Sequence, residues 1–374
     1  MSMNIGTLKE IKNHEYRVGL TPACAGAYVR RGHQVCIEKG AGISTGFGDE
    51  EYVANGATII ESRKKLCDAC EMIVKVKEPL AEEYDLFHEG QILYTFLHLA
   101  ASEELTNALL KRKVKAVAYE TIETDDGDLP CLRPMSEIAG RLSIQEGAKY
   151  LEKTFGGRGV LLGGVPGIQR GKVAILGGGV AGINACKIAV GMGADVTVLD
   201  IDFSRLAYLD DIFGSSITTL YSNDANIDVV LAESDLIIGA VLKPGAKTPK
   251  LIKKDKLSLM KNGAVVVDIA VDQGGCFETT RPTTHDDPIY LVENIVHYCV
   301  GNMPGAVPLS STISLVNTTQ IFGLMIADSG LENACRISPA LRRGINLYMG
   351  NCVYENLSHS LGVDFTSIDG VLNL

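Results

Sequence analysis

Residues 173–182 read Val173-Ala-Ile-Leu-Gly-Gly-Gly-Val-Ala-Gly182, and residues 196–200 read Val196-Thr-Val-Leu-Asp200. An apolar strand, a glycine turn, a helix and a second strand ending in an acid follow the order of a βαβ unit that binds a dinucleotide. Gly177 permits the tight turn, Gly179 lets backbone N–H groups approach a pyrophosphate, and Gly182 lets the helix lie close on the strand. An ordinary βαβ turn without a ligand is the alternative, and the surrounding order of elements argues against it.

Asp200 stands at the end of the second strand. A carboxylate there can accept both hydroxyls of an adenosine ribose and would repel a 2′-phosphate, so we expect NAD rather than NADP. The nearby cation Arg205 weakens this argument slightly, and NAD remains the prediction.

The composition sets the class of protein. A chain of 374 residues exceeds the usual size of one hydrophobic core, and its 46% hydrophobic and 21% charged residues suit buried strands in α/β layers. The formal net charge of −10, without a long run of Lys or Arg, argues against nucleic acid or an anionic membrane as a partner. No apolar run approaches the length of a membrane span and the N-terminus lacks a signal-peptide pattern, so we expect a soluble, cytoplasmic protein.

Ten cysteines are scattered over the chain, mostly in apolar segments where they act as small core residues. The CxxC pair Cys67-Asp-Ala-Cys70 has no second pair at zinc-finger spacing. We therefore predict no metal, and we expect this pair to lie on a helical surface.

The first 120 residues alternate between strand-like and helix-like stretches, which predicts an α/β unit. A helical pattern over residues 136–154 follows as a connector, and another covers residues 311–329. Expected strands lie at 4–9, 34–38, 71–77, 92–97, 115–120, 217–220, 236–241 and 264–269, and expected early helices at 22–31 and 102–113.

This order predicts two Rossmann-like domains. Residues 136–304 form an NAD-binding domain with a doubly wound parallel sheet. The chain leaves that domain near residue 305, so residues 1–135 and 305–374 form a discontinuous substrate and catalytic domain. We expect a cleft between the two.

Residues at the strand ends of the first domain suit substrate chemistry. Arg17 stands in a loop where a guanidinium can grip a carboxylate, although a solvated arginine explains it equally well. Lys75 and Lys77 interrupt a buried-looking strand and point to the same face, so periodicity does not choose between them. His98 follows a strand directly; a hydrogen-bonded core histidine is the commoner case, yet its titration range suits proton transfer.

In the second domain, Asp272 follows the apolar run of residues 265–269. The strand should end near Ile269, which places Asp272 above the carboxyl edge of the sheet, where ligands bind in open α/β folds. The alternative is a turn-forming aspartate ahead of Gly-Gly.

Together these segments resemble the alanine dehydrogenase family over nearly the whole chain, and their ordered set is highly specific. The residues that carry the resemblance are Asn13-His-Glu-Tyr-Arg17, Val74-Lys-Val-Lys-Glu-Pro79, Thr95-Phe-Leu-His-Leu-Ala-Ala101, Pro134-Met-Ser-Glu-Ile-Ala-Gly-Arg141, the glycine turn, Val267-Asp-Ile-Ala-Val-Asp-Gln-Gly-Gly275, Arg281-Pro-Thr-Thr284 and Asn302-Met-Pro304.

The resemblance implies a role for each candidate. Arg17 and Lys77 would hold the substrate carboxylate, Met135 and Ser136 would line the substrate and nicotinamide region, His98 would be the acid/base, and Asp272 would work with water. Gly178 replaces the alanine common in the family, with little expected effect. The implied NAD-binding residues are Ser136, Gly177, Gly179, Val180, Gly182, Asp200, Arg205, Ser222, Val241, Leu242, Ile269, Ala270, Val271, Asp272, Val300, Gly301, Asn302 and Met303.

The implied reaction is the NAD-dependent oxidative deamination of L-alanine to pyruvate and ammonia, and its reverse, by a homohexamer. One alternative is the NAD-binding subunit of a proton-translocating transhydrogenase. No membrane segment follows in this sequence, and His98 stands where the transhydrogenase relatives lack a histidine, so we disfavour it. A catalytically silent NAD sensor is disfavoured because every proposed catalytic group is present.

Overall fold

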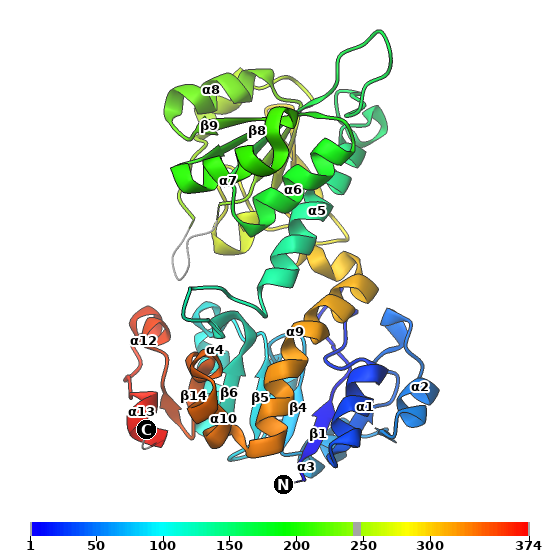
Figure 1. Cartoon of the computed structure of the whole chain (residues 1–374), viewed down its shortest axis with the longest axis vertical. Coiled ribbons are helices and arrows are strands. Elements are labelled where there is room, and N and C mark those ends of the chain that lie inside the picture. The colour runs from blue at the N-terminus through cyan, green and yellow to red at the C-terminus, as the bar shows by residue number, and fades with distance from the viewer. Residues whose placement is uncertain (1, 242–247, 373–374) are drawn as a thin grey trace. The chain divides into compact units, whose positions relative to one another are not determined.

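The computed structural model describes residues 2–241 and 248–372. The chain divides into two compact units, unit 1 with residues 1–135 and 305–374, and unit 2 with residues 136–304. Unit 1 therefore joins the blue-to-cyan and orange-to-red parts of the chain (Figure 1). Each unit is an α/β fold with its own mainly parallel sheet, which confirms the predicted fold class.

Unit 2 carries a seven-stranded sheet in the order β12-β13-β11-β10-β7-β8-β9. The strands from β13 to β9 are parallel, and β12 is antiparallel to β13. Counted from β7, this is the order 3-2-1-4-5-6, which reverses between β7 and β10 and leaves a ligand crevice at their carboxyl ends. The strands are β7 Lys172–Leu176, β8 Asp195–Asp200, β9 Ile217–Tyr221, β10 Leu236–Gly239, β11 Val265–Asp268, β12 Ile289–Val292 and β13 Ile295–Tyr298.

Helices cover this sheet closely. A Cβ on Gly140 would lie 2.1 Å from the carbonyl oxygen of Ala181, so the connector helix and the helix after the glycine turn meet backbone to backbone. The helices are α5 Arg133–Tyr150, α6 Val180–Gly191, α7 Phe203–Phe213 and α8 Asp224–Glu233.

Unit 1 repeats the same strand order. Its eight-stranded sheet runs β15-β14-β6-β5-β4-β1-β2-β3, so the parallel part again follows 3-2-1-4-5-6 when counted from β1. Two antiparallel strands, β14 and β15, extend its edge beyond β6. The strands are β1 Asn4–Thr7, β2 Gln34–Glu38, β3 Thr58–Ile60, β4 Met72–Val74, β5 Ile92–Thr95, β6 Lys115–Ala118, β14 Ile345–Tyr348 and β15 Asn351–Cys352.

Two helical layers enclose this sheet. On one face, Ile73 and Leu93 pack in a core with Leu66 of α3 and Leu109 of α4. On the other face, the hydroxyl of Tyr94 donates to the carbonyl of Thr319 in α9 at 2.9 Å. The helices are α1 Pro22–Arg30, α2 Asp49–Ala54, α3 Arg63–Ala69, α4 Glu103–Arg112, α9 Pro308–Ser329, α10 Leu331–Ile337, α11 Pro339–Arg343, α12 Glu355–Leu361 and α13 Ile368–Leu372.

Local signals place the early helices as predicted. The hydroxyl of Thr21 accepts the N–H of Cys24 at the start of α1, and the hydroxyl of Ser102 accepts the N–H of Leu105 at the start of α4. Each therefore satisfies one of the unpaired donors at a helix N-terminus.

Several strands end earlier than predicted. The stretches expected at 71–77, 92–97 and 115–120 contain strands that end at Val74, Thr95 and Ala118. The remaining apolar residues leave the sheet ladder and enter the loops at its carboxyl edge. The connector helix was also placed too late, since α5 begins at Arg133 and ends at Tyr150.

The expected surface position of the CxxC pair is wrong. Cys67 and Cys70 are 0% and 1% exposed and belong to the core under α3, where Cys70 also lies beside Cys36. Cys67 lies on the inner side of this short helix, and the Sγ of Cys70, the residue after the helix, lies 3.0 Å from where a Cβ on Gly6 of β1 would be.

Within the described residues, α9 is the helix that is long and apolar enough to cross a bilayer. Residues of one of its faces, including Leu315, Val316 and Ile326, are buried in unit 1, and the helix packs against α1 and α10. This pattern is typical of the core helix of an α/β fold.

Candidate active site

The carboxyl ends of β1, β4 and β5 carry the candidate substrate residues of unit 1. Arg17 lies in the loop after β1, Lys77 in the loop after β4, and His98 in the loop after β5. Because β1 and β4 are the strands between which the order reverses, this edge is the crevice position of a doubly wound sheet.

Arg17 is 2% exposed, so it is not a solvated surface arginine. Its Nε donates to Glu15 Oε1 at 2.7 Å and its Nη2 donates to Glu15 Oε2 at 2.5 Å. Its Nη1 contacts the sulfur of Met135 at 2.9 Å. A paired carboxylate thus fixes one edge of the guanidinium and sets the direction in which the rest of the group points.

The two lysines that periodicity could not separate have different surroundings. Lys75 is 0% exposed, and its Nζ donates to Glu10 at 3.0 Å and to Glu83 at 3.1 Å. This buried ion pair accounts for its charge. Lys75 is therefore part of the core of unit 1.

Lys77 makes no ion pair with any residue in the described ranges. Burial lowers the pKa of its ammonium; the charge of Glu78 opposes this effect, whereas Arg17 and Lys12 add to it. Its backbone N–H donates to Glu10 Oε1 at 3.2 Å, so the buried network holds the loop. These features support Lys77, rather than Lys75, as the ligand-binding lysine.

His98 has its backbone in the left-handed region, with φ at 47°. Its side chain is 42% exposed, so it is not a core histidine, and its ring lies parallel to that of Phe96 with centroids 5.9 Å apart. Glu120 Oε1 accepts the backbone N–H of His98 at 2.6 Å and lies 3.9 Å from its Nδ1. One carboxylate therefore holds the strained backbone and lies near the ring.

The glycine turn in unit 2 has the shape that a dinucleotide needs. Gly177 has φ at 101°, and a Cβ on Gly182 would lie 1.8 Å from the carbonyl oxygen of Gly177. A Cβ on Gly179 would meet no atom within 4 Å, so open space faces the N-terminus of α6, which begins at Val180. This cradle fits a pyrophosphate.

Asp200 ends β8 beside this turn. Its Oδ2 accepts the N–H of Gly178 at 2.6 Å and its Oδ1 accepts the N–H of Asp202 at 2.9 Å. A methyl group on Gly178 would lie 2.8 Å from Leu209 and 3.0 Å from the Cγ of Arg205. Glycine at this position therefore lets α7 pack close to the turn.

The remaining predicted NAD residues follow the carboxyl ends of their strands. Ser222 follows β9, and its N–H donates to the carbonyl of Asp200 at 2.9 Å. Leu242 lies outside the described residues. Val241 follows β10, Ile269, Ala270, Val271 and Asp272 lie in a short 3-10 helix after β11, and Val300, Gly301, Asn302 and Met303 follow β13. Ser136 stands in the first turn of α5, next to Met135.

Asp272 is exposed in that 3-10 helix, and a Cβ on Gly301 would lie 2.8 Å from its Oδ1. The buried carboxylate of Asp268 anchors the segment. It accepts the N–H of Ala270 at 3.1 Å, the N–H of Cys276 at 2.8 Å and the hydroxyl of Thr280 at 2.5 Å. Burial raises the pKa of Asp268, and these hydrogen bonds oppose that effect.

Four acids that support these residues were not predicted from the sequence: Glu10, Glu15, Glu120 and Asp268. Glu15 and Asp268 stood beside assigned residues, so a search for carboxylates flanking a buried cation or a site loop could have found them. Glu10 and Glu120 bind loops that are distant in the sequence, and no local pattern reveals such pairs. Among the residues that the structure describes, no group of three His, Cys, Asp or Glu side chains could hold a metal ion.

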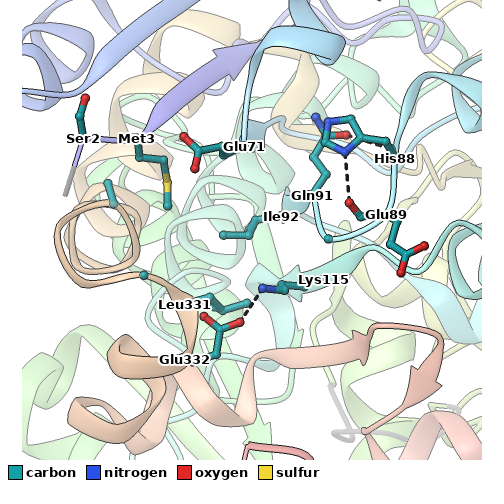
Figure 2. Close-up of a pocket in the computed structure, with 13 residues that line it drawn as sticks. Ser2, Met3, Glu71, His88, Glu89, Gln91, Ile92, Lys115, Leu331 and Glu332 are labelled. Carbon is teal, nitrogen blue, oxygen red and sulfur yellow. Dashed lines mark hydrogen bonds and ion pairs between the residues drawn. The ribbon is translucent and has the colours of Figure 1, made fainter.

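A separate cavity of about 400 Å³ lies at the opposite edge of the unit 1 sheet. Met3, Glu71, Gln91 and Lys115 line it at the amino ends of their strands, and Lys115 pairs with Glu332 of α10 at 2.5 Å (Figure 2). This cavity shares no lining residue with the candidate active site.

One Rossmann-type unit with a dinucleotide turn, and a second with cations and an exposed imidazole at its carboxyl edge, define a dinucleotide-dependent dehydrogenase. The models of the alanine dehydrogenase/PNT N-terminal and C-terminal domains match residues 6–139 and 143–355. The chain belongs to the alanine dehydrogenase family.

Individual relatives agree with this assignment. The chain is 53% identical over 372 residues to an alanine dehydrogenase of Methanococcus maripaludis, covering 99% of this chain and 100% of that protein. A solved L-alanine dehydrogenase is 50% identical, with a TM-score of 0.94 over 96% of this chain and 99% of its own. The transhydrogenase from Sinorhizobium meliloti shares the fold, with a TM-score of 0.80 at 21% identity over 94% and 99% of the two chains.

Proposed function

We propose that this chain catalyses the NAD-dependent oxidative deamination of L-alanine to pyruvate and ammonia, and the reverse reductive amination. The observation that carries the proposal is one sheet edge in unit 1 with a buried arginine, a lysine that forms no ion pair within the described part of the chain, and an exposed imidazole. The two cations suit a substrate carboxylate and the imidazole suits a proton transfer. The transhydrogenase alternative is supported by the shared family models and by a similarity of fold at 21% identity, whereas the solved L-alanine dehydrogenase is 50% identical.

Arg17 and Lys77 bind the substrate carboxylate and fix the direction of the α-hydrogen, which is a contribution of positioning. Glu15 fixes the guanidinium of Arg17, and Met135 packs against it. When bound at unit 2, NAD⁺ supplies the acceptor for the hydride of the α-carbon.

His98 takes the proton that the substrate ammonium must lose before its nitrogen can donate electrons to the α-carbon. Loss of the hydride then leaves an iminium ion, which water must attack. We assign the orientation of that water to Asp272, acting with His98. The carbinolamine that results releases ammonia and leaves pyruvate.

In unit 2, the glycine turn and α6 hold the pyrophosphate and Asp200 accepts the ribose hydroxyls. Asp268 stabilises the segment 269–272 that approaches the nicotinamide side. Unit 1 is thus the substrate domain and unit 2 the NAD domain.

The decisive assay mixes the purified protein with NAD⁺ and L-alanine and follows the formation of NADH. Absence of NADH, under conditions where the protein binds NAD, would reject the proposal. His98→Ala should keep its affinity for NAD and lose turnover by about 10²-fold or more. Unchanged turnover would remove His98 from the mechanism.

We also propose that the enzyme is a cytoplasmic homohexamer. Leu309, Ile313 and Ile321 are exposed and lie along one face of α9, which supports a contact between subunits. Light scattering of the purified protein measures the number of subunits directly.

A further inference from the structure

Glu78 follows Lys77 in the loop after β4, and the mechanism above leaves it without a role. Its Oε1 forms an ion pair with Nζ of Lys12. Its Oε2 is buried and has no hydrogen-bond partner in the described part of the chain. A buried carboxylate oxygen without a donor is costly, so this atom points to a donor supplied by a ligand.

The charges around Glu78 belong to the candidate active site. Burial raises the pKa of Glu78, but the charges of Lys77, His98 and Lys12, in that order of effect, together lower it below the usual range. Glu78 is therefore an anion at neutral pH, and the two charges that act on it most strongly are those of Lys77 and His98, which we assign to the substrate.

The substrate also carries a hydrogen-bond donor, its amino group, for which no acceptor has been assigned so far. L-alanine carries a carboxylate, which Arg17 and Lys77 bind, and an ammonium group, which loses water when it enters the site. Glu15 is already occupied by Arg17. His98 receives a proton and carries no negative charge with which to hold a cation.

We infer that Oε2 of Glu78 is the hydrogen-bond acceptor for the amino nitrogen of the substrate, and for ammonia or ammonium in the reverse reaction. This inference rests on the proposed function. It gives the two ends of the amino acid separate partners on one loop, with Lys77 for the carboxylate and Glu78 for the nitrogen. The carboxylate of Glu78 also holds the amino nitrogen beside His98, and His98 removes a proton from that nitrogen.

The test is the reductive amination catalysed by Glu78→Gln, in which shape is kept and charge is lost. We expect the KM for ammonium to rise about tenfold or more while the KM for pyruvate changes less than about threefold, because a hydrogen bond to a charged group is lost at one end of the substrate only. Glu78→Asp, a shorter carboxylate, should recover part of the ammonium affinity.

Lys12→Gln is the matched control, since it breaks the same ion pair and leaves the free oxygen of Glu78 in place. We expect a KM for ammonium within about threefold of the wild type. An equal rise in Lys12→Gln and Glu78→Gln would overturn the inference, because the pair would then merely shape the loop. An unchanged KM for ammonium in Glu78→Gln would also overturn it. The activity of the wild type with L-alanine is measured alongside. If the wild type is active, the result for Glu78→Gln tests the role of Glu78 alone. If it is inactive, the proposed function itself has failed.

Discussion

The carboxylate of Glu120 accepts the backbone N–H of His98 at 2.6 Å, and the same oxygen lies 3.9 Å from Nδ1 of the imidazole. It also accepts the N–H of Leu97 at 3.1 Å. A left-handed backbone costs free energy in a residue other than glycine, so these hydrogen bonds hold His98 in a conformation that it would otherwise leave. Glu120 is thus a positioning residue for the proposed acid/base.

Replacing Glu120 should separate turnover from substrate binding. We expect Glu120→Ala to lower kcat about tenfold or more, with a smaller change in the KM for L-alanine, since the backbone that positions the imidazole is no longer held. Glu120→Gln keeps an oxygen acceptor for the backbone and should recover part of the activity. Steady-state kinetics measures both values, and the exposed Glu123→Gln is the control. A rise in KM alone would contradict this assignment.

The two lysines of the β4 loop should fail in different ways. Lys75→Met leaves the carboxylates of Glu10 and Glu83 buried without their cation, and we expect a loss of unfolding free energy of about 3–5 kcal/mol. Lys77→Ala should keep its stability and raise the KM for pyruvate by about 10- to 100-fold.

Chemical denaturation and kinetics of both variants check this prediction, with the exposed Lys39→Ala as the control. The opposite result, in which Lys77→Ala unfolds and Lys75→Met binds pyruvate poorly, would show that the lysines were assigned the wrong way round.

As the pH rises, pyruvate binding should weaken at a lower pH than it would with an ordinary lysine in the site. Burial lowers the pKa of Lys77, and only its charged form attracts a carboxylate. As the pH rises through this lowered pKa, the charge is lost and the Kd of pyruvate increases, before an ordinary lysine would lose its proton. Binding to the enzyme with NADH, followed by NADH fluorescence, measures the effect. Lys77→Arg should show no such rise over the same pH range, because a guanidinium stays charged.

Asp200 should set the preference between the two nicotinamide cofactors. Asp200→Ala removes the acceptor for the ribose hydroxyls and for the N–H of Gly178, so we expect the Kd of NAD to rise about tenfold and the discrimination against NADP to fall. Asp202→Asn, which keeps the cap of α7 and removes a neighbouring charge, should bind NAD as the wild type does. Calorimetric titration of both variants decides the matter, and equal losses would indicate a general effect of charge.

Much of the fold follows from local patterns. Short apolar runs with glycine turns between them predict parallel strands, and the capping residues Thr21 and Ser102 mark helix starts that the structure confirms. The edge strand β12 and its neighbour β13 were not predicted, because they lack such a signal: Ile289–Val292 is only partly buried, and Ile295–Tyr298 contains His297. A search for apolar runs does not detect a strand that contains a polar residue or that has only one buried face.

The positions of His98 and Asp272 at the carboxyl edges of the sheets were predictable, because each follows an apolar run, and both lie in the segments after β5 and β11. The choice between Lys75 and Lys77 needed the family resemblance, because residues two apart share one face of an extended chain. The structure explains Lys75 through Glu10, which lies 65 positions away in the sequence. Contacts at such separations in the sequence depend on the tertiary fold, so a local sequence pattern does not predict them.

The shared strand order of the two sheets has a consequence for their origin. The loop after β1 in unit 1 occupies the place that the glycine turn takes after β7 in unit 2. In the function that we propose, this place offers backbone N–H groups to a phosphate in one unit and the guanidinium of Arg17 to a carboxylate in the other. Two copies of an ancestral half, diverging after a duplication, would have kept an anion at the first turn and exchanged only the chemistry that holds it.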